Sequence, residues 1–510
     1  MPNHFVKVFL LAAACLPLSA SAQVTNWMPT TGGSWSNPAN WSNGVPNSIT
    51  ANAGISRNIS DDEVVDLGGG SFTVNALQLR DAGTTFFNWT VSNGTLTFDA
   101  ANAGSAVLLS ENAGATGHVI SADIVLNRTV LADIRTLTVL SGNVSGSGAL
   151  SRNLNSGTLE LRSVSGTWTL SLSAGTLRLA GDSDTAFNRN TTILGNVGIQ
   201  VARVGIGGSV NHTMGTLSIG GQTLTVTAGP NFSPDAAFGL SFGTTTVTGN
   251  ATFDVADNGG GTGTLTLGAL DTGGGARTLV KAGAGTLVLD STALVAIGSR
   301  FDVNGGRLVY NSNPVSNSIG RLAVTVNNGG TLAGQNNAAT SPLGAVVVGT
   351  GGVLAPGNSV GVLTGDGGLT FEEDAVYEWE LSAPSTANGA FDRFDLTGGS
   401  LAFPGTPTLS LSFIGTAAAP TASDPFWQQD RTWSGIIRLS GPATNPSNAF
   451  QMQIDNAPWA LVGSFATQLD GATGSVDLIW TFAPIPEPAG WAALTAGLAF
   501  AGLLLRRRKD

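Results

Sequence analysis

A tripeptide that returns at a nearly constant interval constrains the fold of this 510-residue chain more than any other feature. It consists of a glycine, one intervening residue and a leucine, and it usually opens a strand-like run. In its unbroken series the glycines lie 22, 21, 24 and 22 residues apart, at Gly263, Gly285, Gly306, Gly330 and Gly352. A period of this length is typical of repeat proteins, in which each copy buries its apolar face against the next.

The residues that follow the tripeptide alternate as a β-strand does. Leu287 and Leu289 are two apart, as are Leu177 and Leu179, so each pair shares one face of its strand. About 21 residues would provide three short strands and three turns, and the glycines would allow tight corners. We therefore expect an all-β, right-handed parallel β-solenoid (β-helix), since parallel crossovers are overwhelmingly right-handed. A glycine-rich antiparallel β-sandwich is the alternative, although it would not need the same tripeptide at the same period.

Composition supports a β fold and excludes several functional classes. The chain has 70 glycines, only 11% charged residues and 42% hydrophobic residues, which disfavours simple disorder. The net charge of −11 argues against a nucleic-acid partner, because an acidic surface repels phosphate.

The N-terminus has the pattern of a secretory signal peptide. Lys7 precedes an apolar run from residue 8 to 18, and Ala20-Ser21-Ala22 provides small residues for cleavage between Ala22 and Gln23 by signal peptidase. Lipid attachment at Cys15 is a weaker alternative. Cleavage after Ala22 would remove Cys15, the only cysteine, so disulfides and thiolate metal sites are not expected in the mature chain.

The C-terminus has the pattern of a single membrane span. Seventeen uncharged residues, 489–505, follow Pro486-Glu487-Pro488, and a helix of that length spans roughly 25 Å. A stop-transfer cluster ends the chain, formed by Arg506, Arg507, Arg508 and Lys509. An ordinary membrane anchor would have these features too.

The order of the Pro-Glu-Pro motif, the short span and the basic tail resembles the PEP-CTERM sorting segment of bacterial envelope proteins. The resemblance extends from Pro486 to the end of the chain. It implies an exosortase-type processing enzyme as partner, which cuts near Pro486-Glu487-Pro488, and only a transient anchor in the inner membrane.

The repeats themselves resemble autotransporter-associated β-strand repeats. The first half of the motif matches residues 279–289 and the second half 303–308, and later repeats match 324–334 and 354–361. The long spacer usual between the two halves is missing here, and no membrane β-barrel follows. Residues 35–46 resemble the opening segment of the same surface proteins.

These features predict five regions along the chain. We expect a signal peptide (1–22), an N-terminal cap segment (23–60), the solenoid (61–371), a β-rich C-terminal cap region (372–483) and the sorting segment with its single transmembrane helix (484–510). Trp27, Trp35 and Trp41 lie close together in the first cap. They could stack on sugars, but covering the exposed core of the first turn is the simpler role.

No catalytic motif is found, and we expect no cofactor and no bound metal. His118 and His212 have no metal-ligand spacing and are expected on the surface. The acidic run Asp61, Asp62, Glu63 and Asp66 could bind calcium, although a solvated turn is the simpler interpretation. Asp392, Arg393 and Asp395 could form an acid pair with an arginine, although a polar strand entrance is again simpler.

We therefore expect an exported structural or adhesive protein of the cell surface or extracellular matrix, associated with exopolysaccharide and not an enzyme. Two alternatives stay open. One is a β-helix polysaccharide lyase or hydrolase, whose acidic residues would converge from distant turns. The other is a carbohydrate-binding surface module that grips sugar with its tryptophan clusters.

Overall fold

The computed structural model describes residues 24–311, 321–336, 342–440 and 452–483. Over these ranges the chain forms strands and two short 3-10 segments, Pro38–Asn40 and Ala457–Trp459, and it has no α-helix. The described residues divide into two compact units, the first made of 24–181 and 187–204, the second of 182–186 and the described residues from 205 to 483. Together they hold about 14 turns of parallel β-solenoid.

Two stacks of parallel strands build the first unit, with one strand of each stack in most turns. One stack contains β1 (Val24–Asn26), β3 (Asn52–Arg57), β6 (Ala76–Asp81), β9 (Ala106–Glu111), β12 (Thr129–Ile134), β14 (Ala149–Leu154), β16 (Thr169–Leu172) and β19 (Thr191–Ile193). The other contains β2 (Gly33–Ser34), β4 (Glu63–Asp66), β5 (Ser71–Val74), β7 (Trp89–Ser92), β8 (Thr95–Phe98), β10 (His118–Ile120), β11 (Asp123–Leu126), β13 (Thr138–Gly146), β15 (Thr158–Val164), β17 (Thr176–Ala180) and β20 (Val197–Ala202).

Apolar residues of successive turns meet in register inside the first unit. Val130 pairs with Leu150, and Leu150 with Leu170, so these two turns have the same length. Other turns differ in length: Leu159 pairs with Leu177 across a shorter turn, and Leu77 pairs with Leu108 across a longer one. The loops between strands differ in length from turn to turn, while the buried apolar residues of successive turns stay paired.

The second unit is built in the same way and ends in a third sheet. One stack contains β18 (Thr185–Ala186), β21 (Val210–Thr213), β22 (Leu217–Ile219), β24 (Phe238–Phe242), β25 (Thr245–Val247), β27 (Gly263–Asp271), β29 (Thr286–Leu294), β31 (Gly306–Tyr310), β33 (Gly330–Gly334), β35 (Val353–Pro356), β38 (Val376–Leu381) and β41 (Thr408–Phe413). The other contains β23 (Thr223–Ala228), β26 (Thr252–Val255), β28 (Thr278–Ala282), β30 (Arg300–Val303), β32 (Ala323–Val326), β34 (Val346–Val348), β37 (Leu369–Phe371) and β40 (Leu401–Ala402).

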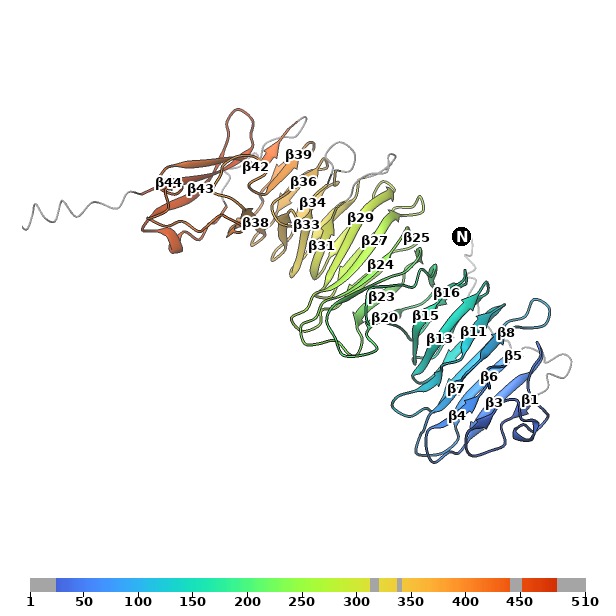
Figure 1. Cartoon of the computed structure of the whole chain (residues 1–510). Coiled ribbons are helices and arrows are strands. Elements are labelled where there is room, and N and C mark those ends of the chain that lie inside the picture. The colour runs from blue at the N-terminus through green and yellow to red at the C-terminus, as the bar shows by residue number, and fades with distance from the viewer. Residues whose placement is uncertain (1–23, 312–320, 337–341, 441–451, 484–510) are drawn as a thin grey trace, which may run out of the picture. The chain divides into compact units, whose positions relative to one another are not determined.

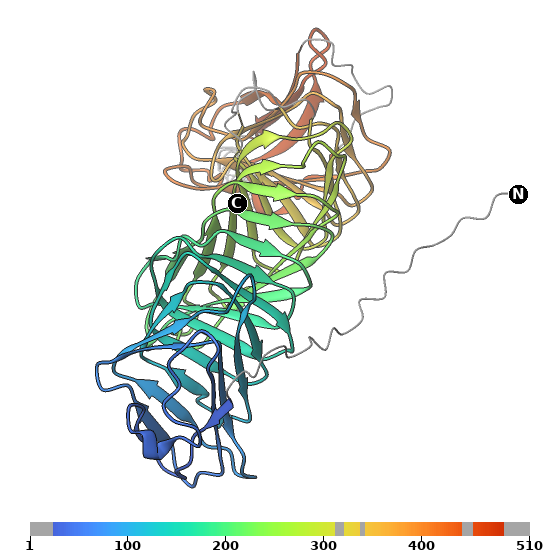
Figure 2. The same ribbon diagram turned by 90° about the vertical axis from the view of Figure 1, so that its right-hand side faces the viewer.

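From Gly263 to Gly352 the repeated tripeptide of the sequence places one leucine in each turn of this unit. Each leucine of the series pairs with the next, and none is exposed: Leu265, Leu287, Leu308, Leu332 and Leu354. Strands β24, β27, β29, β31 and β33 lie side by side in Figure 1, and Figure 2 shows the strands as successive rungs after a quarter turn. The predicted parallel solenoid is thus confirmed, and an antiparallel sandwich is wrong for this segment.

The expectation of three short strands per turn holds for β21, β22 and β23 and for β24, β25 and β26, whereas from β27 to β35 each turn has one strand in each stack. The long strand β27 explains the difference, since it pairs with β24 along one part and with β25 along another. Two short strands separated by a bend therefore stay within one sheet instead of turning a third corner.

Parallel pairing continues beyond residue 371, because β35 pairs with β38 and β38 with β41. A five-stranded sheet then combines β36 (Val362–Gly365), β39 (Arg393–Leu396), β42 (Arg431–Leu439), β44 (Val476–Phe482) and β43 (Gly463–Leu469). Its last two pairings are antiparallel.

The export signals predicted at the two ends fall outside the described residues. This applies to the signal peptide with its cleavage site at Ala22 and Gln23, and to the whole segment 484–510. Within the described ranges, no helix has the length and apolar character that crossing a membrane requires.

Candidate functional site

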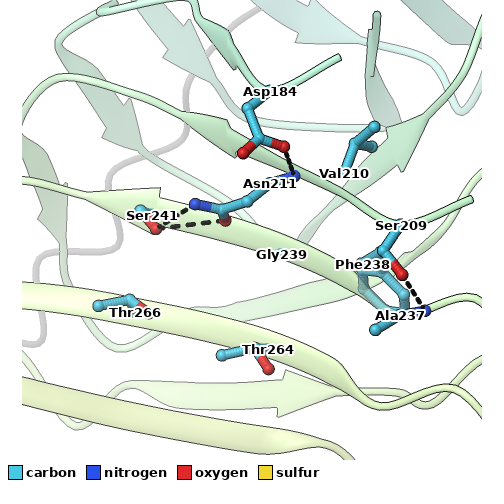
Figure 3. A pocket seen from close by; sticks show the side chains of 10 residues that line it. All are labelled: Asp184, Ser209, Val210, Asn211, Ala237, Phe238, Gly239, Ser241, Thr264 and Thr266. Carbon is cyan, nitrogen blue, oxygen red and sulfur yellow. Dashed lines mark hydrogen bonds between the residues drawn. The ribbon is translucent and has the colours of Figure 1, made fainter. Parts of the chain in front are cut away.

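The first candidate site is a groove on the outward face of the second unit, with a volume of about 460 Å³ (Figure 3). Side chains of β21, β24 and β27 line it, together with Asp184 just before β18 and Ser209 just before β21. Its lining residues are Asp184, Ser209, Val210, Asn211, Ala237, Phe238, Gly239, Ser241, Thr264 and Thr266. The size lies within the range of small-ligand sites.

Gly239 forms the floor of the groove. It lies between Asn211 and Thr264 in the strand register. A β-carbon at this position would collide with the Asn211 side-chain oxygen, which leans over the glycine. The missing side chain of Gly239 thus leaves room for the Asn211 side chain, and both residues line the groove.

Hydrogen bonds orient part of the lining (Figure 3). The Asn211 backbone N–H donates to the Asp184 carboxylate at 2.8 Å, and the Asn211 side chain makes contacts of 3.4 Å with the Ser241 hydroxyl. Ser209 accepts the Ala237 backbone N–H at 3.0 Å. The result is a hollow lined by one carboxylate, one amide and several hydroxyls.

A second hollow, of about 250 Å³, is lined by three carboxyl groups and by residues of earlier turns. Glu378 and Glu380 on β38 line it together with Asp392, and Arg307 on β31 contributes its guanidinium. The remaining lining comes from Ala355, Pro356, Gly357, Asn358, Ser359 and Ile414. Most of segment 354–361, which resembles the late repeats of the surface proteins, therefore borders this hollow.

Asp392 is the buried acid of this second hollow, with only 1% of its surface exposed. It accepts the Gly361 backbone N–H at 2.8 Å and the Glu380 backbone N–H at 3.1 Å. Burial raises the pKa of Asp392 to about 8, although the two backbone bonds and Arg307 act against the rise. Such a carboxyl is protonated at neutral pH, which is the state that a general acid needs.

The other two residues of the predicted group, Arg393 and Asp395, lie close to Asp392 in the sequence and contact each other. Arg393 and Asp395 form an ion pair with a 2.6 Å contact on β39. Neither of them lines the second hollow, whereas Asp392 does. Asp392 acquires its neighbours Glu378 and Glu380 from the packing of separate segments, which the sequence pattern could not indicate.

The three tryptophans of the first cap, and three of those near the other end, are buried. Trp27 and Trp35 are fully buried and Trp41 is 4% exposed, with ring centroids 5.0 Å apart for Trp27 and Trp41 and 4.8 Å for Trp35 and Trp41. At the other end Trp427, Trp433 and Trp480 are also buried, so these rings form cores instead of binding surfaces.

The prediction that both histidines lie on the surface is wrong. His118 and His212 are completely buried. His118 Nδ1 accepts the Trp89 backbone N–H at 3.0 Å, and Nε2 lies 3.1 Å from the Glu111 carbonyl oxygen. Burial lowers the pKa of His118 to about 4, so the ring is neutral at physiological pH.

In the acidic run considered for calcium, the carboxylates accept hydrogen bonds from backbone and side-chain amide groups. Glu63 accepts the Gly32 N–H at 2.6 Å, Asp62 accepts the Asn88 N–H at 2.7 Å, and Asp66 accepts the Gly68 N–H at 2.7 Å. In the described part of the chain, no group of three or more His, Cys, Asp or Glu side chains is placed to hold a metal ion.

Buried cations such as Lys281 and Arg152 were not predicted. Lys281 donates to the carbonyl oxygens of Ala282, Gly283 and Gly305 at 2.7, 2.8 and 3.0 Å, and burial lowers its pKa to about 8. Arg152 donates to the carbonyl of Gly157 at 2.8 Å. Their strand positions gave a signal, since Lys281 and Leu279 have the same parity, as do Arg152 and Leu150.

Comparison with known proteins adds no family. No protein-family model matches the chain, and no curated protein matches it.

Proposed function

We propose that this chain is an exported structural or adhesive protein of the bacterial cell envelope, associated with extracellular polysaccharide. The observation that supports this best is that inward and outward positions in the strands of the second unit carry different kinds of side chain. Leucines fill the interior of each turn, while hydroxyl and amide side chains on the outward face line an open groove. Such a stack offers a large, rigid surface without a bound cofactor.

The proposal includes the export route. Signal peptidase cuts between Ala22 and Gln23, and the C-terminal helix anchors the chain in the inner membrane as a right-handed solenoid forms outside. An exosortase-type enzyme then cuts near Pro486-Glu487-Pro488 and releases or transfers the protein to the surface or matrix. The residue order at both termini supports this route.

Mass spectrometry of the surface-exposed protein, recovered from intact cells, tests the export route. We expect a mature N-terminus at Gln23 and a C-terminus that lacks Arg506 to Asp510. An intact Asp510 on surface protein contradicts the processing step, and a protein confined to the cytoplasm contradicts the function itself.

A second candidate function, polysaccharide hydrolysis, is favoured by one observation. Asp392, a buried acid whose pKa is raised to about 8, lines a hollow together with Glu378 and Glu380. Glycosidases pair a protonated carboxyl with a carboxylate in this manner: the acid protonates the leaving oxygen, and the base takes a proton from the attacking water.

Incubation with a polysaccharide panel separates the two functions. New reducing ends that disappear in both Asp392→Asn and Glu378→Gln would establish hydrolysis. Arg393→Gln is the matched control, since Arg393 is adjacent in sequence but does not line the hollow. Unchanged chain lengths leave the structural function as the conclusion.

A further inference from the structure

We propose that the groove formed by β21, β24 and β27 is a binding site for a neutral glycan, recognised through its vicinal hydroxyl groups. This inference rests on the proposed association with polysaccharide and names the site and the ligand class. The strand register brings polar residues of three strands together. Outward-facing positions form two adjacent columns, one of Asn211, Gly239 and Thr264, the other of Thr213, Ser241 and Thr266.

The columns place polar groups at a regular spacing. Neighbouring parallel strands lie about 4.8 Å apart, so the hydroxyls of Ser241 and Thr266 repeat at that interval. Gly239 interrupts the other column between Asn211 and Thr264, and the Asn211 side chain lies over it. A bound chain would thus find a depression bordered by hydrogen-bonding groups on several sides.

These groups keep hydrogen-bonding capacity for a ligand. Within the described part of the chain, the hydroxyls of Thr264 and Thr266 take part in no hydrogen bond. The Asn211 amide has two N–H donors and one carbonyl acceptor, yet within the groove it contacts only Ser241, at a long 3.4 Å. Donors and acceptors side by side match the sugar hydroxyl, which both donates and accepts.

The charges of the lining select the class of glycan. Asp184 is the only charged residue among those that line the groove, and it is exposed. A carboxylate can accept hydrogen bonds from two adjacent hydroxyls, whereas it repels a uronate or a sulfate. Since no lysine or arginine lines the groove, an anionic polysaccharide has no countercharge there.

Beyond the groove one of the two columns becomes apolar, whereas the other continues with Thr286, Arg307 and Thr331. The column that contains Ser241 and Thr266 continues with Val288 on β29 and Val309 on β31, and only 6% of Val309 is exposed. Val309 packs with Ala333 and Ala355 in an apolar cluster. Two polar columns side by side are therefore found at the groove, while from β29 to β31 only one of the two columns is polar.

Affinity electrophoresis of the purified full-length chain tests the site, with dextran, mannan and soluble β-glucan as neutral probes and alginate as the anionic probe. The variant Thr264→Val/Thr266→Val removes two hydroxyls at nearly constant shape. Thr331→Val is the matched control, an outward-facing threonine on β33 outside the groove. Asn211→Ala is a second groove variant.

We expect the native chain to bind at least one neutral probe, and the groove variants to bind it about tenfold more weakly, as the loss of one or two hydrogen bonds implies. Thr331→Val should bind as the native chain does. Equal affinity of groove and control variants would overturn the site, and binding of alginate alone would overturn the ligand class. Absence of binding to every neutral probe would also overturn the inference, whereas failure of the export function would appear separately as a protein absent from the cell surface.

Discussion

The buried His118 gives a pH dependence that can be worked out from its surroundings. Trp89 donates its backbone N–H to Nδ1, so the neutral ring must carry its proton on Nε2, which faces the Glu111 carbonyl. Protonation of Nδ1 would place two donors against each other. Burial is the largest cause that lowers the pKa to about 4, and it outweighs the Glu111 carbonyl and the charges of Asp81 and Asp62.

The sign follows from comparing the folded and unfolded chains. An unfolded histidine takes up a proton near pH 6.5, whereas folded His118 does so only near pH 4. The stabilisation is complete above pH 6.5 and is lost as the pH falls toward 4, because the unfolded chain then binds the extra proton. At pH 4.5 the loss amounts to about 2–3 kcal/mol of unfolding free energy.

Urea denaturation followed by tryptophan fluorescence at pH 7 and pH 4.5 measures this loss. His118→Asn keeps an acceptor for the Trp89 N–H but has no proton to gain. The native chain should therefore lose about 2–3 kcal/mol more than this variant between the two pH values. Val119→Ala, on the same strand, is the control and should lose as much as the native chain. Equal losses in native chain and His118→Asn would refute the reasoning.

Three further predictions concern the second unit. Leu287→Ala should cost about 2–5 kcal/mol of unfolding free energy and Thr286→Ala less than about 1 kcal/mol, since only the leucine fills the interior column; equal costs in chemical denaturation would contradict the column. Gly283 and Gly274 both have φ of +74°, but only at Gly283 would a β-carbon meet the backbone of the preceding turn. Gly274→Ala should therefore cost about 1 kcal/mol and Gly283→Ala clearly more in thermal unfolding, and similar melting temperatures would count against the close approach. Because the pKa of Asp392 is raised, its stabilisation should decline as the pH rises from about 4 to 8, and Asp392→Asn should not show this decline when unfolding is measured across that range.

Periodicity made the buried columns predictable. The leucines after Gly263, Gly285 and Gly306 recur at a regular interval, and the structure pairs them directly. The number of strands per turn was not predictable, because it depends on whether a bend in the backbone leaves the sheet. Alternation within the strands could have revealed the burial of His118, which has the same parity as Ile120.

The two hollows were harder to foresee. Asp184, Asn211 and Gly239 meet across loops of irregular length, in a stretch where the tripeptide period is interrupted. Glu378 and Asp392 come together because the chain between them folds back, so that Leu381 pairs with Phe391 in antiparallel fashion. Contacts of this kind depend on three-dimensional packing, which a residue pattern read in one dimension does not encode.

The uneven length of the turns has a consequence for how such a chain can change. Residues added at a corner, as between Leu77 and Leu108, only enlarge a bulge on the outside. A single residue deleted from the middle of β12 would instead invert the side chains beyond it, turning Ile134 toward water and Asp133 toward the interior. Natural variants of this chain should therefore carry their insertions and deletions at the rims of the coil and almost none within its rungs.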